Sequence, residues 1–164
     1  MTHGKAPSGR TPPEGLHTPY ITEVVRSLLT LGLSVADDEA TVLAGPPRFA
    51  SIPIEADVIG GRWRDAEWML LAWDERSGWS WQVKLVHEPS PRDAVYFGVA
   101  LLPEPGQIAT WASTLLVHRG LRLARRPHKP HFAGPDLDTA LAAYDGLAGA
   151  AREVSIAVRA SDEM

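Results

Sequence analysis

Residues 67–86 read EWMLLAWDERSGWSWQVKLV and contain the clearest structural pattern of the chain. Between positions 79 and 85, apolar side chains alternate with polar ones, which is the period of a strand that buries one face. Residues 68–73 are apolar at both parities, as expected for a strand that is covered on both sides. The connection at 74–78 is short and ends in Gly78, a residue type that readily adopts the positive φ of hairpin loops. We therefore predict an antiparallel hairpin at the centre of a sheet.

Four other segments have the composition of strands. Residues 40–43 predict a short strand, and residues 94–102 are almost wholly apolar and predict a buried one. Residues 49–59 alternate, but Pro53 lacks a backbone N–H, so we place that strand at an edge of the sheet or begin it after the proline. Residues 121–126 alternate over a few positions and predict a last short strand. The segments from 50 to 102, hairpin included, predict an antiparallel meander of about four strands, and we expect a central antiparallel sheet of about four to five strands in all.

Three segments have the sequence features of helices, at residues 18–31, 105–119 and 136–152. The first begins with Thr18 as its expected N-cap and Pro19 at its first helical position, followed by apolar residues at helical spacing. An apolar stripe on a helix must be covered, so we expect the helices to pack on the sheet. The predicted fold class is therefore α+β. The expected organisation is a disordered leader at 1–17, a single domain at 18–160 and a tail at 161–164.

The central hairpin also carries a family resemblance. Residues 71–79, LAWDERSGW, are followed by Pro103-Glu104-Pro105 and by Ile108-Ala109-Thr110-Trp111. This arrangement resembles a family of uncharacterised actinobacterial domains, in which a Trp-Asp-Glu turn closing on Gly-Trp precedes a Pro-led helix. The likeness covers about residues 18–125. It implies a fold of the type predicted above and an actinobacterial source, and it implies no activity.

Composition and charge exclude several classes of protein. The 164 residues include no Cys, which excludes disulfides, thiolate metal sites and a Cys nucleophile. No apolar run approaches the ~18 residues of a membrane span, and the N-terminus lacks the apolar core of a signal peptide, so we expect a cytoplasmic protein without a membrane partner. The formal net charge is −4, but the charges are unevenly distributed along the chain, because no acidic residue lies between Glu104 and Asp136.

No segment predicts a catalytic site, a metal site or a cofactor. His128 and His131 could supply two zinc ligands, but a site needs three or four. The Gly-x-Ser-x-Gly elbow of acyl-transfer enzymes does not occur, nor does a phosphate-binding Gly-rich loop that leads into a helix. We therefore expect a protein that is not an enzyme.

Two alternatives remain for the function. Trp and Arg are enriched at the centres of protein–protein interfaces, and the chain has six Trp. We expect a non-enzymatic protein–protein interaction module whose partner is a second copy, forming a homodimer, or another protein. The alternative is a nucleic-acid-associated protein, because a basic segment at 119–131 could contact phosphates. The candidate residues for these two roles are Trp73, Trp79, Trp81, Arg119, Arg122, Arg125, Arg126 and Lys129.

Overall fold

A computed structural model of the chain describes residues 15–36, 41–43, 45, 47–55, 61–118, 129–131 and 137–145. A five-stranded antiparallel sheet follows the chain order, and its strands are β1 (Thr41–Leu43), β2 (Phe49–Pro53), β3 (Ala66–Asp74), β4 (Gly78–Leu85) and β5 (Val95–Tyr96). Helix α1 (Thr18–Thr30) precedes the sheet, α2 (Pro105–Val117) follows it, and residues 137–145 are also helical. The predicted α+β class, with an antiparallel meander and three helices, is confirmed.

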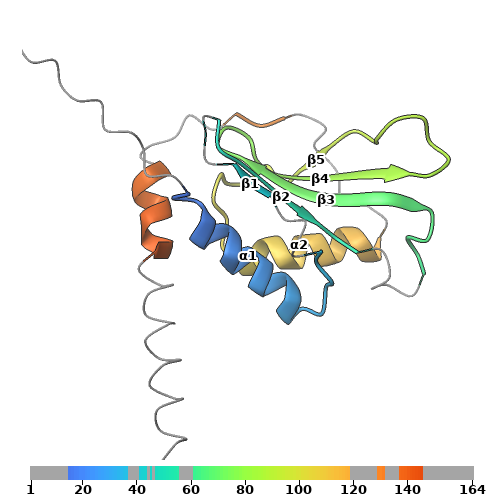
Figure 1. The fold of residues 1–164 in the computed structure, drawn as a ribbon, viewed down its shortest axis with the longest axis horizontal. Helices are drawn as coiled ribbons and strands as arrows, with labels where there is room; N and C mark the ends of the chain where they lie inside the picture. Colours follow the sequence, from blue (N-terminus) through green and yellow to red (C-terminus); the bar gives the residue numbers. More distant parts are fainter. Residues whose placement is uncertain are drawn as a thin grey trace, which may run out of the picture.

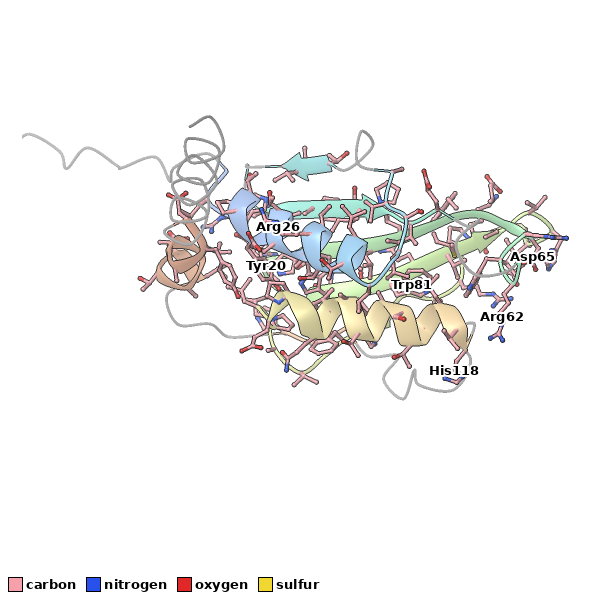
Figure 2. All side chains as sticks on the ribbon, turned by 90° about the horizontal axis from the view of Figure 1, so that it is seen from below. Tyr20, Arg26, Arg62, Asp65, Trp81 and His118 are labelled. Carbon is pink, nitrogen blue, oxygen red and sulfur yellow. The ribbon has the colours of Figure 1, made fainter. Side chains whose placement is uncertain are left out.

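Helices α1 and α2 lie side by side against one face of the sheet (Figure 1). Tyr20, Val24 and Leu28 are completely buried on α1, at the i, i+4, i+8 spacing that places them on one side of a helix. The sheet meets them with alternate residues of its strands, including Leu71 of β3, which is likewise completely buried. Trp81 lies between the sheet and α2 (Figure 2). The core is thus a single layer between the sheet and its two helices.

The central hairpin has the structure that its sequence predicts. Asp74 pairs with Gly78 across the turn, and Gly78 has a φ of 70°. The Oδ1 atom of Asp74 accepts hydrogen bonds from the backbone N–H groups of Arg76 (2.9 Å) and Ser77 (2.8 Å). The carboxylate therefore satisfies turn amides that the β-ladder cannot reach.

A buried hydrogen-bond chain through Tyr20 ties α1 to the sheet and to the segment before α2. The indole Nε1 of Trp79 donates to the Tyr20 hydroxyl (2.9 Å), and this hydroxyl donates to the carbonyl oxygen of Pro103 (2.8 Å). The edge of the Tyr144 ring, in the helical segment 137–145, packs against Tyr20 at 4.9 Å between ring centroids. Burial raises the pKa of Tyr20 well above its usual range, so the hydroxyl remains a donor.

The other end of α2 is held by the turn before β3. Trp63 Nε1 donates to the carbonyl oxygen of Leu116 (2.9 Å), and Arg62 Nη1 donates to that of Val117 (2.6 Å). Figure 2 shows Arg62 at the same end of the molecule as His118, the C-cap of α2. These donors satisfy carbonyl groups that a helix leaves unpaired in its last turn. In the part of the chain that the structure describes, no helix is long and apolar enough to cross a membrane.

Two expectations for the first half of the chain are wrong in detail. Strand β2 is not an edge strand, because β1 pairs with it on one side and β3 on the other. Ile54 N donates to Met69 O of β3, so the Pro53 nitrogen points to the opposite side of β2, beyond Ser51, which is the last residue of β2 that pairs with β1. The N-cap of α1 is His17, one residue before the expected Thr18.

The predicted strand at 94–102 is formed only at Val95–Tyr96. Gly98 has a φ of 69°, which turns the chain away from β4. The chain then passes beside the hairpin turn, where the Leu101 carbonyl accepts a hydrogen bond from Trp73 Nε1 (2.9 Å). The segment that follows Gly98 therefore covers the hairpin turn and does not extend the pairing with β4. The strand expected at 121–126 lies outside the described residues.

Candidate interaction surface

The three tryptophans proposed for an interaction role are core residues. Trp73 and Trp79 are completely buried and Trp81 is 2% exposed. The register of β3 and β4 places Trp73 opposite Trp79, and the indole of Trp81 packs edge-on against Trp63 at 6.2 Å. None of the three presents a surface to a partner, so we assign them to the core and no longer to an interface.

Most of the proposed basic residues lie outside the described residues: Arg119, Arg122, Arg125 and Arg126. Lys129 is described and is exposed, with its Nζ 4.0 Å from Oδ2 of Asp74. Burial would raise the pKa of Asp74, but hydrogen bonds from Ser77 and Arg76 outweigh that effect and hold the pKa below its usual value. Lys129 therefore has a carboxylate neighbour that remains ionised at neutral pH.

An apolar groove runs along α1 beside the first strand of the sheet. It has a volume of about 400 Å³. Leu29 lies on this side of α1 and leaves 51% of its surface exposed. Val42 faces the helix layer, because it pairs with Ala50, whose side chain is in the core. The residues that line the groove are Thr18, Ile21, Thr22, Val25, Arg26, Leu29 and Val42.

Strand β1 forms the rim of this groove and the end of the sheet. Its one neighbour among the described strands is β2, so its other backbone edge faces away from the sheet. Its residues are Thr41, Val42 and Leu43, and Leu43 is 54% exposed on the face away from the helices. Natural edge strands are commonly protected by shortness, charged residues or proline, and β1 has only three residues, none of them charged or proline. Figure 2 shows Arg26 on α1 at the side nearer to β1, with Tyr20 on the side nearer to α2.

The sequence did not single out Leu29 or Val42. Leu29 falls outside the buried stripe of the helix predicted at 18–31. An apolar residue off that stripe is the one feature of the sequence that could have indicated an exposed apolar surface. Val42 becomes informative only when the strand order places it at the end of the sheet next to α1. A single apolar residue at the surface is ordinary, and only a contiguous group of such residues is an indication of an interaction site.

The charged residues at the hairpin end of the sheet have a structural role. Arg48 lies between two carboxylates, with its Nε 3.4 Å from Glu75 and its Nη2 2.5 Å from Asp138. It therefore joins the helical segment 137–145 to the sheet. His17 beside it is completely buried and stacks on Trp73 at 5.5 Å. Among the described residues, no group of three or more His, Cys, Asp or Glu residues is placed to hold a metal ion.

A second hollow, of about 610 Å³, lies at the N-terminus of α2. The one carboxylate in its lining belongs to Glu104 and accepts a hydrogen bond from the backbone N–H of Gln107. In return, the side-chain oxygen of Gln107 accepts a hydrogen bond from the backbone N–H of Glu104 (3.1 Å). This is a capping box, and it uses the polar groups of the hollow to satisfy the helix end. Phe97 and Trp111 complete the lining and pack edge to face at 5.4 Å. The hollow is therefore accounted for by helix capping and aromatic packing.

Fold and surface together define a small α+β domain with an apolar groove between α1 and the end of the sheet formed by β1. Residues 20–114 match the model of a family of unknown function, DUF6292. The match covers more than half of the chain, which therefore belongs to this family. It extends from Tyr20 in α1 to Thr114 in α2 and includes the whole sheet and all residues of the groove lining except Thr18. Neither a curated protein nor a solved structure matches the chain.

Proposed function

We propose that the protein is a non-enzymatic protein–protein interaction module of the cytoplasm, and that it self-associates through the α1–β1 edge. The observation that carries the proposal is the exposed apolar groove next to an uncharged strand edge. Burial of apolar surface is the main driving force of association. The actinobacterial source suggested by the hairpin motif belongs to the same proposal.

The size of the surface bears on the affinity. Full burial of a Leu or Val side chain contributes about 1.5–3 kcal/mol, and Leu29 and Leu43 are each already about half buried. Strand β1 offers only three residues for pairing, and each net hydrogen bond contributes about 1 kcal/mol. Association also costs several kcal/mol in lost translational and rotational freedom. The gains exceed this cost by at most about 6 kcal/mol, so we expect weak, reversible self-association with a Kd on the order of tens of micromolar, not an obligate oligomer.

Sedimentation equilibrium over a range of protein concentrations tests the proposal, with Leu29→Glu as the disrupting variant. Glu and Leu have similar helix propensities, so α1 is retained while a charge enters the groove. We expect the wild type to dimerise and Leu29→Glu to raise the Kd at least tenfold, a loss of about 1.4 kcal/mol.

The matched control is Val99→Glu. Val99 is 75% exposed in the loop before α2 and lies away from the groove lining. It receives the same charge, so an effect of net charge alone would appear in both variants. We expect its Kd to equal that of the wild type. A wild type that stays monomeric up to about 100 μM, or a Leu29→Glu variant that dimerises as tightly as the wild type, would overturn the proposal.

A further inference from the structure

We propose that the helical segment 137–145 is a detachable clasp, which covers Tyr20 in the closed state and opens as a unit while the sheet, α1 and α2 stay folded. The ion pair between Arg48 and Asp138 controls how often it opens. Figure 1 shows the clasp, in orange, beside the start of α1. The clasp shares no residue with the groove lining, so its opening is a property separate from the self-association proposed above.

The first feature that supports the clasp is how few side chains attach it to the core. Leu141 is completely buried, Leu137 and Tyr144 are half-buried, and the other six residues of 137–145 are exposed. By comparison, α1 buries four residues and α2 buries five. The nine described residues of the clasp are too few for a helix that is stable by itself in water, so these three side chains hold it in place. A unit with few buried apolar contacts opens before the rest of a fold.

The second feature is the polar anchor of the clasp. Nη2 of Arg48 lies 2.5 Å from Oδ1 of Asp138, and Nε of the same guanidinium lies 3.4 Å from Glu75 in the hairpin turn. Only 14% of the Arg48 side chain is exposed, against 52% of the Asp138 side chain. When the clasp opens, Arg48 and Glu75 stay together on the sheet, so the largely buried guanidinium keeps a carboxylate neighbour. The Asp138 side of the ion pair is therefore released at small cost, and salt lowers that cost further.

The third feature is that the hydrogen bonds under the clasp are complete without it. The Tyr20 hydroxyl accepts a hydrogen bond from Trp79 (2.9 Å) and donates one to the Pro103 carbonyl oxygen (2.8 Å). The clasp adds the edge contact of Tyr144 with the Tyr20 ring. The family match at 20–114 includes Tyr20 and both of its hydrogen-bond partners and ends before the clasp. Opening therefore uncovers an aromatic ring without breaking either hydrogen bond.

Hydrogen exchange of the full chain, followed by mass spectrometry, measures the opening of the clasp. We expect the backbone amides of 137–145 to exchange at least about 100-fold faster than those of β3 and β4. Urea below the unfolding transition should accelerate exchange in β3 and β4 and leave 137–145 nearly unchanged, because opening of the clasp exposes little surface. Exchange of 137–145 that is as slow and as urea-dependent as that of β3 and β4 would overturn the clasp.

Leu141→Ala removes the one completely buried side chain of the clasp. In this variant, residues 137–145 should exchange at the rate of an unstructured peptide, while β3 and β4 remain protected. A wild type in which 137–145 already exchanges at that rate would contradict the closed state. Loss of protection in β3 and β4 as well would show that the clasp and the core are one cooperative unit.

Asp138→Asn tests the ion pair, and Asp145→Asn is its matched control. Asp145 is exposed on the same helix and has no ion pair in the part of the chain that the structure describes. We expect Asp138→Asn to accelerate the exchange of 137–145 about two- to fivefold and Asp145→Asn to leave it unchanged. Raising NaCl from about 0.05 M to about 1 M should accelerate the wild type by a similar factor, but not Asp138→Asn. Equal exchange in the two variants would rule out control by the ion pair.

Arg48→Met places the control on the opposite side of the same ion pair. In this background, Asp138→Asn should lose most of its effect on the exchange of 137–145, because its partner is already absent. A full effect of Asp138→Asn without Arg48 would assign that effect to the helix and not to the ion pair, which would overturn the proposed control.

The dependence of exchange on protein concentration separates the clasp from the proposed function. A clasp that docks on its own chain exchanges at a rate independent of concentration, and Leu29→Glu, which disrupts the groove, should leave that rate as in the wild type. Exchange of 137–145 that slows as the concentration rises, in the wild type and in Leu29→Glu alike, would mean that the clasp docks on a second copy. That result would overturn the clasp within one chain and leave association through the groove standing.

Discussion

His17 is the residue whose burial gives the clearest pH effect. Its ring is completely buried against Trp73, with Nε2 3.3 Å from the Phe49 carbonyl oxygen, and burial lowers the pKa of the imidazole below its ordinary value of 6.5. Between the folded and unfolded pKa values the unfolded chain binds the proton and the folded chain does not. The free energy of unfolding is therefore fully retained above about pH 6.5 and falls as the pH drops below that value. We predict a lower unfolding free energy at pH 5 than at pH 7, measured by urea denaturation.

Substitution of His17 isolates its contribution to the difference in unfolding free energy between pH 7 and pH 5. His17→Phe keeps an aromatic ring against Trp73 and removes the titrating group, so it should narrow the difference between pH 7 and pH 5. His131→Phe is the control, because His131 is exposed and its loss should leave the difference as in the wild type. A His17→Phe variant with the full pH dependence of the wild type would show that the effect arises elsewhere.

At the scale of single elements, the central hairpin depends on Gly78. Its φ is 70°, and a Cβ atom there would lie 3.2 Å from the Ala100 carbonyl oxygen and 3.4 Å from the Leu101 Cα, both in backbone that passes beside the turn. The positive φ alone costs a residue with a side chain about 1–2 kcal/mol. We predict that Gly78→Ala lowers the unfolding free energy by at least that amount, measured by urea denaturation followed by tryptophan fluorescence.

Gly106→Ala is the matched control for this prediction. Gly106 lies in the first turn of α2, its φ is not positive, and a Cβ atom there would meet open space. Alanine is favoured over glycine in helices by up to about 1 kcal/mol, so this variant should be as stable as the wild type or more stable. Equal losses of unfolding free energy in Gly78→Ala and Gly106→Ala would mean that position 78 is not constrained by the hairpin turn.

The same hairpin shows why some elements could be predicted from the sequence and others could not. Its strands and turn follow from local signals, namely the period of two and a glycine in a short connection. The strand expected at 94–102 ends early because Gly98 turns the chain toward the indole of Trp73, a contact across the fold that no local pattern contains. Pro53 was misplaced for a related reason, since its effect depends on where the neighbouring strand ends. Local periodicity thus predicts elements, while their lengths and neighbours depend on tertiary contacts.

At the scale of the whole molecule, the three tryptophans that the sequence suggested for an interaction role are buried in the core. Large aromatic residues are enriched in interfaces and in cores alike, and in this chain the register of β3 and β4 places Trp73, Trp79 and Trp81 on the covered face. The candidate surface is formed by Leu29 and Val42, two ordinary aliphatic residues that the strand order brings together. The sequence pattern does not contain the solvent exposure of each side chain, because that exposure depends on the assembled fold.

Self-association also predicts how the stability of the whole molecule depends on its concentration. When a folded dimer unfolds to separate chains, a tenfold increase in protein concentration stabilises it by about 1.4 kcal/mol per mole of dimer. Calorimetric scans at concentrations above the Kd should therefore show a Tm that rises by about 2 °C per tenfold step. Leu29→Glu, which places a charge in the groove, should show this rise only at concentrations above its own, at least tenfold higher Kd, and Val99→Glu should follow the wild type. A wild-type Tm that stays constant above the measured Kd would mean that folding and association are not coupled at the α1–β1 edge.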